Sequence, residues 1–205
     1  MRNLTLAKNF LNLSLLIMGS LVSSVGLAQS SGNYPNKPIT LVVTYPPGGG
    51  ADAMARLLAP KMGEALGQSV IVENKPGASG QIAAAAVAKS APDGYTMMLD
   101  ASSFAVNPSL YSKLPYDSLK AFKPIGVVAL FPNVVLVNSN FSAKNVSELI
   151  ATAGKTKESV SYASSGNGSA QHLAGALFES AAKVDMVHVP YKGGGPALND
   201  VIGGQ

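Results

Sequence analysis

The fold is decided by the stretch Ile39-Thr-Leu-Val-Val-Thr-Tyr-Pro-Pro-Gly-Gly-Gly-Ala-Asp-Ala-Met-Ala-Arg-Leu-Leu58. An apolar run typical of a buried strand passes through three glycines directly into an amphipathic helix pattern. Glycines have no Cβ, so backbone N–H groups in such a turn can approach a ligand closely. The start of the helix adds free N–H donors and the positive end of its dipole. The stretch therefore predicts an anion-binding site built from main chain.

Short apolar runs alternate with helical patterns along the chain, which predicts βαβ units and largely parallel sheets. We expect strands over 39–44, 70–73, 95–99, 160–163 and 186–189, and helices over 52–66, 81–89, 145–153, 170–183 and from 196 onward. Between 102 and 122 the pattern loosens through proline-bearing segments, and further apolar runs follow at 125–130 and 134–137. A boundary between lobes is expected there, with a first α/β lobe over 29–102 and a second over 103–205.

A second strand, glycine loop and helix junction follows in the second lobe, where Ser164-Ser-Gly-Asn-Gly-Ser169 opens a helix. Ligands of open α/β sheets bind outside the carboxyl ends of the strands. Two such junctions that face each other would form a cleft between the lobes.

The N-terminus has the pattern of an export signal. Arg2 and Lys8 are positive, 10–22 is mostly apolar, and Gly26-Leu27-Ala28 places small residues before a cut at Gln29. We expect a cleaved signal peptide over 1–28 and an exported protein. The sequence contains no cysteine, which excludes disulfides, thiolate metal sites and a lipid anchor on an N-terminal cysteine.

Charge and composition exclude several classes of partner and chemistry. Residues 1–28 hold two of the 15 basic residues and none of the 11 acidic ones, which leaves a net charge of +2 for the remainder. No basic run or aromatic stacking motif indicates nucleic-acid binding. The two histidines, His172 and His188, have no close carboxylate spacing, so no metal site is predicted. Each is more typical of a structural histidine than of a catalytic one.

The main alternative is a dinucleotide-binding oxidoreductase. Residues 48–53 match G-x-G-x-x-A, and Glu73 ends the next expected strand about 20 residues further on. Pro46-Pro47 separates the strand from the glycines, however, and Asp52 would repel a pyrophosphate. A hydrolase is weaker still, because neither Ser79 nor Ser169 has the glycines of a nucleophile elbow. We expect no catalytic residues and no cofactor.

Arg56 is the only arginine after residue 28, so a bidentate guanidinium clamp from both lobes is excluded. Asp52 and Arg56 stand at i and i+4, and an ordinary helix ion pair is an alternative to a ligand role for both. Main-chain amides, hydroxyls and bridging water are left to bind a ligand.

Several motifs together resemble the Bug-type periplasmic solute-binding proteins of tripartite tricarboxylate transporters, over nearly all of 34–205. The matching stretches are Tyr34-Pro-Asn-Lys-Pro-Ile39, Pro46-Pro-Gly-Gly-Gly-Ala-Asp52, Val72-Glu-Asn-Lys-Pro-Gly-Ala-Ser-Gly80, Ala91-Pro-Asp-Gly-Tyr-Thr96, Asn107-Pro-Ser-Leu-Tyr111, Leu114-Pro-Tyr-Asp117, Tyr162-Ala-Ser-Ser-Gly-Asn-Gly-Ser169 and Val187-His-Val-Pro-Tyr-Lys-Gly193. Their order and spacing are specific as a set, although each alone is weak.

The resemblance implies a two-lobe periplasmic binding protein of type II, with three-layer αβα lobes that close on a small organic carboxylate. It implies delivery of that ligand to inner-membrane permease subunits, by a monomer. The ligand contacts implied in the first lobe are Pro47, Gly48, Gly49, Gly50, Ala51, Asp52, Asn74, Gly77, Ser79, Gly80, Ser102 and Ser103. Those implied in the second lobe are Ser165, Gly166, Asn167, Gly168, Ser169 and His172, with Tyr191 and Lys192 at the rim.

Members of this family continue well beyond the position of Gln205 and return to the first lobe. The resemblance therefore implies a chain that is truncated at its C-terminus, with an incomplete fold. We expect such a fragment to be marginally stable and to bind carboxylates weakly, because too little apolar surface is buried.

Overall fold

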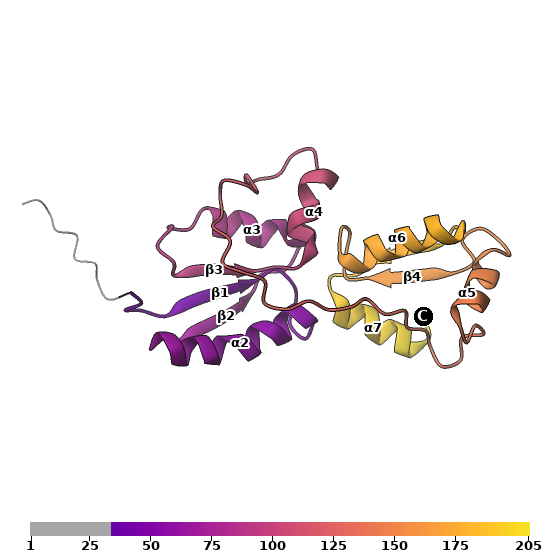
Figure 1. Cartoon of the computed structure of the whole chain (residues 1–205), viewed down its shortest axis with the longest axis horizontal. Helices are drawn as coiled ribbons and strands as arrows, with labels where there is room; N and C mark the ends of the chain where they lie inside the picture. Colours follow the sequence, from indigo (N-terminus) through magenta and orange to yellow (C-terminus); the bar gives the residue numbers. More distant parts are fainter. Residues whose placement is uncertain (1–33) are drawn as a thin grey trace, which may run out of the picture. The chain divides into compact units, whose positions relative to one another are not determined.

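The computed structural model describes residues 34–205, which form an α/β arrangement with two parallel sheets (Figure 1). The predicted signal peptide lies outside the described residues. None of the helices between residues 34 and 205 has the length and apolar character that crossing a bilayer requires.

The first lobe is built on a three-stranded parallel sheet. The central strand is β1 (Ile39–Val43), with β2 (Val70–Asn74) on one side and β3 (Thr96–Leu99) on the other. In the register, Val43 lies opposite both Asn74 and Leu99, so the carboxyl ends of all three strands meet at one edge. The predicted strands 39–44, 70–73 and 95–99 are confirmed to within a residue.

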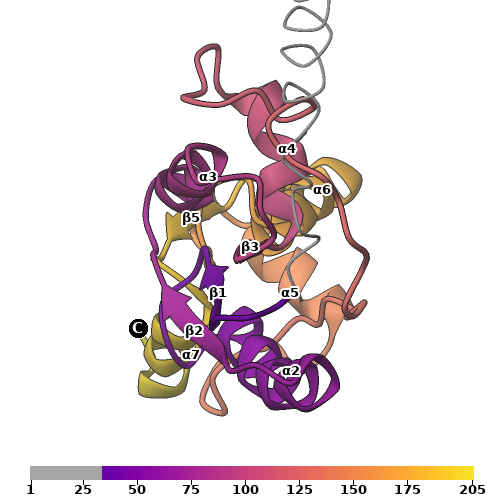
Figure 2. The ribbon, with the colours of Figure 1, turned by 90° about the vertical axis from the view of Figure 1, so that its left-hand side faces the viewer.

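Helices cover both faces of this sheet. The helix α2 (Gly50–Leu66) packs against β1 and β2, and α3 (Gln81–Ala88) packs against β1 and β3 after the short 3₁₀ turn η1 (Ala78–Gly80). Figures 1 and 2 show α2 and α3 on opposite sides of the sheet. Because β1 is covered from both sides, it carries a near-continuous apolar run.

The core of the first lobe forms where α2 meets the sheet. Leu41, Val43 and Ala55 are buried there, with Val72 and Met97 packed against them. The helix α2 continues through Pro60, although a proline removes one helical hydrogen bond.

The segment after β3 differs from the sequence-based expectation. Where the pattern loosened, the structure has a helix, α4 (Ser102–Leu110), which continues through Pro108. Its start is fixed by the Asp100 carboxylate, which accepts the Phe104 N–H at 2.7 Å. The Phe104 ring packs edge-on against Phe122 at 5.0 Å between centroids. Local capping and aromatic packing therefore stabilise a helix that hydrophobic periodicity does not indicate.

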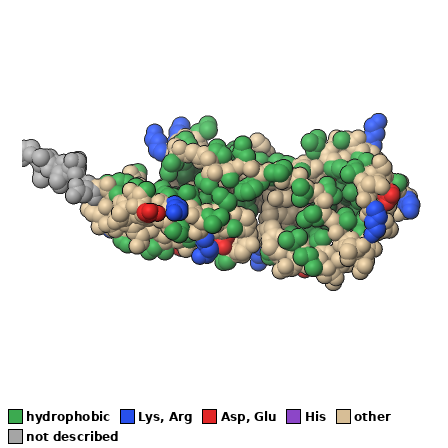
Figure 3. Space-filling model, turned by 60° about the horizontal axis from the view of Figure 1, so that its bottom comes forward, with side chains coloured by type: hydrophobic (Ala, Val, Ile, Leu, Met, Phe, Trp, Pro, Cys, Tyr) green, Lys and Arg blue, Asp and Glu red, His purple; other side chains and the backbone are tan. Residues whose placement is uncertain are grey.

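The apolar runs 125–130 and 134–137 lie outside any helix or strand and are largely exposed. Ile125 is 85% exposed and Leu130 is 89% exposed. In the space-filling view, hydrophobic side chains reach the surface over much of the visible face (Figure 3).

The second lobe has a two-stranded parallel sheet of β4 (Ser161–Ser164) and β5 (Val187–Pro190). The helix α6 (Ala170–Ala182) packs on both strands and α7 (Gly194–Gly203) packs on β4, and Figure 1 shows these two helices on opposite sides of the sheet. A separate core forms around α5 (Val146–Ala153), with Leu149, Val160 and Val184 buried. Each sheet is therefore covered by helices on both faces, as expected for three-layer lobes.

Candidate functional site

The first glycine loop, which joins β1 to α2, has its turn at Gly48, with φ of +82°. The backbone N–H of Gly48 donates to Oδ2 of Asp52 at 2.9 Å. Asp52 is buried, with only 4% of its surface exposed. One of the amides predicted to bind an anion is therefore bonded to a carboxylate of the protein itself.

Asp52 is the centre of a polar network that ties this loop to β2. Arg56 donates from Nε to its Oδ2, and Asn74 donates from Nδ2 to its Oδ1 at 2.9 Å. The hydrogen bond from Arg56, followed by that from the Gly48 amide, lowers the pKa of Asp52 to about 2. The i,i+4 ion pair considered as an alternative is confirmed, at 3.0 Å between Arg56 and Oδ1 of Asp52.

Asn74 uses its whole amide group in this network. Its Nδ2 donates to the Tyr45 carbonyl and to Asp52, and its Oδ1 accepts from Arg56 at 3.0 Å. The structure therefore gives Asp52 and Asn74 a role in fixing the first loop.

The loop after β2 approaches the sheet edge closely. A Cβ on Gly80, whose φ is +81°, would lie 3.2 Å from Cβ of Thr44. Ser79 also adopts a left-handed φ, its hydroxyl lies 3.2 Å from that of Tyr111, and its carbonyl accepts from Asn107 at 2.9 Å. Gly77, with φ of +127°, completes the turn.

Asp100, which the sequence did not single out, organises Ser103 at the start of α4. Its carboxylate accepts hydrogen bonds from the Thr44 hydroxyl and from the Ser103 hydroxyl. The Ser103 hydroxyl lies 3.2 Å from each of the two carboxylate oxygens. Burial raises the pKa of Asp100. The hydroxyl of Ser103 also lies 2.8 Å from that of Tyr45, and burial, with Asp100 nearby, raises the pKa of Tyr45 to about 12. The Ser102 hydroxyl is buried without a partner among the described residues.

The second glycine loop, 164–169, joins β4 to α6. Gly166 and Gly168 have φ of +132° and +74°, and their amides donate to Ser164 Oγ and His172 Nδ1 at 3.1 Å each. Ser169 caps α6 by accepting the His172 N–H at 3.3 Å. In this loop the acceptors are a hydroxyl and an imidazole, so the loop contains no carboxylate acceptor for these two amides.

The other predicted second-lobe residues lie near this loop or after β5. The Ser165 hydroxyl donates to Gln171 at 2.8 Å. The Tyr191 N–H donates to the Ser164 carbonyl, while its hydroxyl donates to Asp200 at 2.6 Å, and this bond raises the pKa of Tyr191. Lys192 is exposed.

Loops from the two sheets come close to each other at two points. A Cβ on Gly193 would lie 2.6 Å from Cγ of Pro46, and one on Gly168 would lie 2.7 Å from Cδ1 of Leu110 in α4. The first loop therefore lies beside the β5–α7 loop, whereas the second glycine loop lies beside α4.

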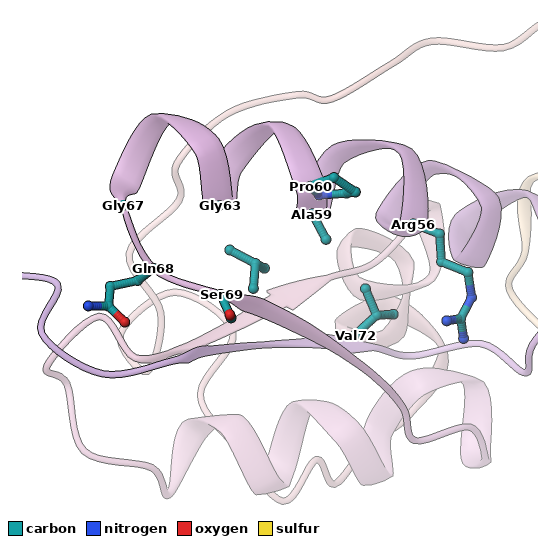
Figure 4. A pocket seen from close by; sticks show the side chains of 9 residues that line it. Arg56, Ala59, Pro60, Gly63, Gly67, Gln68, Ser69 and Val72 are labelled. Atoms are coloured by element: carbon teal, nitrogen blue, oxygen red, sulfur yellow. The ribbon is translucent and has the colours of Figure 1, made fainter.

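A groove with a cavity volume of about 760 Å³ lies elsewhere, between α2 and β2 (Figure 4). It is lined by Arg56, Ala59, Pro60, Gly63, Gly67, Gln68, Ser69, Val70 and Val72. None of the predicted ligand residues is among them, and Arg56 is already bonded to Asp52 and Asn74. This groove is therefore separate from the glycine loops.

Two parallel-sheet lobes with glycine loops at the carboxyl ends of their strands define a class of α/β protein in which small ligands bind outside the strand ends. The model of the tripartite tricarboxylate transporter receptor family matches residues 54–205, and the chain belongs to this family. The predicted resemblance and fold class are confirmed.

Relatives of known sequence or structure agree with this assignment. The chain is 39% identical over 194 residues to the protein BugT of Bordetella pertussis. The aligned region covers 93% of this chain and 60% of BugT. A Rhodopseudomonas palustris protein solved with adipate has a TM-score of 0.79 and 37% identity, covering 82% of this chain and 56% of that one. MatC from Rhodopseudomonas palustris, solved with bound malate, has a TM-score of 0.77 and 33% identity, covering 84% of this chain and 59% of that one. The chain spans little more than half the length of these relatives.

Proposed function

We propose that this protein binds a small organic carboxylate outside the cytoplasmic membrane and delivers it to the permease subunits of a tripartite tricarboxylate transporter. The observation that carries the proposal is membership of the receptor family, together with structural relatives that were solved with adipate and malate. The proposal includes export by a signal peptide over 1–28 and action as a monomeric binding protein without catalytic residues.

The proposed site combines main-chain donors of the second glycine loop with hydroxyls at the start of α4. The second loop supplies Gly166 and Gly168, whose amides are bonded to neutral acceptors that an ionised ligand can displace. Hydrogen bonds to a charged acceptor are about twice as strong as those to a neutral one, which favours the displacement. The serines at the start of α4 supply hydroxyls, and Ser102 has a buried hydroxyl without a partner among residues 34–205.

The dinucleotide alternative is disfavoured by the same geometry. The Gly48 amide, which would face a pyrophosphate, is bonded to the buried Asp52 carboxylate. A low pKa keeps that carboxylate ionised at neutral pH, so a negative charge lies where the phosphates would bind.

The test is thermal unfolding of the purified protein with malate, adipate, succinate, citrate and aspartate, with NAD and the neutral diamide of malate as controls. At a ligand concentration of 100 Kd, binding stabilises the folded state by about 2.7 kcal/mol, which raises the melting temperature. We expect a rise with one or more carboxylates and none with the diamide. A rise with NAD alone would replace this proposal with the oxidoreductase alternative.

A further inference from the structure

Three aromatic rings stack behind the second glycine loop. His172 and His188 lie parallel, with 3.9 Å between ring centroids and 7° between planes. Tyr162 stacks on His188, with 5.0 Å between centroids. The rings come from three elements, because His172 is in the first turn of α6, His188 in β5 and Tyr162 in β4.

His188 is tied to the loop through Ser164. Its Nε2 lies 2.7 Å from Oγ of Ser164, which is buried. That hydroxyl donates to the Gly166 carbonyl and accepts the Gly166 N–H. The Ser164 hydroxyl has a single proton, and that proton is directed to the Gly166 carbonyl. We therefore assign the proton of the hydrogen bond between Ser164 and His188 to Nε2 of His188. Burial, and then the neighbouring His172, lower the pKa of His188, which keeps this ring neutral.

His172 holds the other loop amide through its second nitrogen. The Gly168 N–H donates to Nδ1 of His172 at 3.1 Å, so Nδ1 carries no proton in this state. A carboxylate that takes the Gly168 N–H must displace Nδ1. The displaced Nδ1 can then take a proton from solvent, and the resulting imidazolium lies next to a bound anion.

Resting on the proposed function, we propose that carboxylate binding at the Gly168 amide is coupled to protonation of His172 at Nδ1, and that His188 is the positioning residue for this exchange. The Gly168 N–H transfers from Nδ1 to a carboxylate oxygen, and one solvent proton forms the new N–H bond. Two positive rings 3.9 Å apart would repel strongly, so the pair takes up one proton and not two.

The other ionisable groups near the rings are consistent with a single proton. Glu179 of α6 accepts the Met186 N–H at 2.6 Å, and its charge partly offsets the lowering of the His188 pKa. Tyr162 of β4 has a pKa raised by burial and by Glu179, so it stays neutral. On α7, which packs on β4, Asp200 is held by the Tyr191 hydroxyl.

The test is isothermal titration of the protein with malate and adipate between pH 8 and 6.5, in buffers of different ionisation enthalpy. Carboxylic acids ionise near pH 4, so the ligands stay charged over most of this range. We expect affinity to rise by about threefold to tenfold as the pH falls, with uptake of up to one proton per ligand, since one coupled proton gives at most about tenfold per pH unit.

Two variants separate the roles of the histidines. In His172→Gln the amide oxygen can accept the Gly168 N–H but cannot take a proton, so we expect weaker binding at pH 6.5 and no pH dependence. His188→Phe keeps a stacked ring and removes the second imidazole, which competes with His172 for the proton. The rise in carboxylate affinity should therefore begin at a higher pH than in the wild type. A merely structural role for His188 would lower affinity equally at every pH. Glu64→Gln, on exposed surface in the first lobe, is the control and should keep the wild-type profile.

Each outcome decides between the two proposals. Binding with a flat pH profile, or with the same profile in His172→Gln, would overturn this inference and leave the proposed function intact. Absence of carboxylate binding at every pH would overturn both.

Discussion

The two glycine loops bond their amides to different kinds of acceptor. In the first lobe the Gly48 amide donates to the buried Asp52 carboxylate, whereas in the second lobe Gly168 donates to a neutral imidazole. A carboxylate ligand gains little by competing with an internal carboxylate, but it forms a stronger bond than an imidazole does. Similar sequence patterns therefore produce one loop that is locked by the Asp52 carboxylate and one whose Gly166 and Gly168 amides are held by a hydroxyl and an imidazole.

Replacing Asp52 should have the largest effect on stability, because the locked loop depends on it. Asp52→Ala removes the acceptor of the Gly48 amide, Arg56 and Asn74. The Arg56 side chain is 54% exposed and stays solvated, so we expect a loss of about 2–3 kcal/mol in the free energy of unfolding, measured with urea. Glu64→Ala, in the same helix but exposed, should cost less than about 0.5 kcal/mol.

The pH dependence of this loss identifies its origin. The pKa of Asp52 in the folded protein is lowered from 3.8 to about 2. Its contribution to stability is therefore complete above about pH 4 and is lost as the pH falls toward 2. The difference between wild type and Asp52→Ala should shrink over that window. An equal difference at pH 7 and pH 2.5 would attribute the loss to packing instead of charge.

Much of the first lobe could be predicted from sequence, because strand, glycine turn and amphipathic helix leave strong local patterns. The two glycine loops could be located in the same way. What could not be predicted was which loop amides are already occupied, since Asn74 reaches Asp52 across 22 residues of sequence. Asp100 and His188 were missed as organising residues for the same reason: their partners are distant in sequence, with Thr44 just after β1 and Ser164 at the end of β4.

The two loops should also differ in their tolerance of a side chain. Gly168 has φ of +74°, and a Cβ there would lie 2.7 Å from Cδ1 of Leu110. Gly49 has φ of −86°, and its nearest such contact is the Pro46 carbonyl at 3.7 Å. We expect Gly168→Ala to lower the free energy of unfolding by about 1–2 kcal/mol and carboxylate affinity by about tenfold. Gly49→Ala, which replaces a tolerated cap by a poorer one without backbone strain, should cost only about 0.5 kcal/mol. Equal costs for the two variants would remove the distinction between the loops.

The smallest effect should come from the helix caps, which also differ between the loops. The cap of α2 is Gly49, which has no side-chain bond, whereas the cap of α6 is Ser169, whose hydroxyl accepts the His172 N–H at a long 3.3 Å. Ser169→Ala removes that acceptor and should lower the free energy of unfolding by about 1 kcal/mol, while Ser169→Gly should cost only a few tenths of a kcal/mol because glycine is a tolerated cap. Asn145→Ala, which removes the cap of α5 far from both loops, is the matched control for stability.

If Ser169 serves only as a cap, carboxylate affinity in Ser169→Ala will match that in Asn145→Ala. A loss of affinity confined to Ser169→Ala would instead show that its hydroxyl, together with the exchangeable amides, contacts the ligand directly.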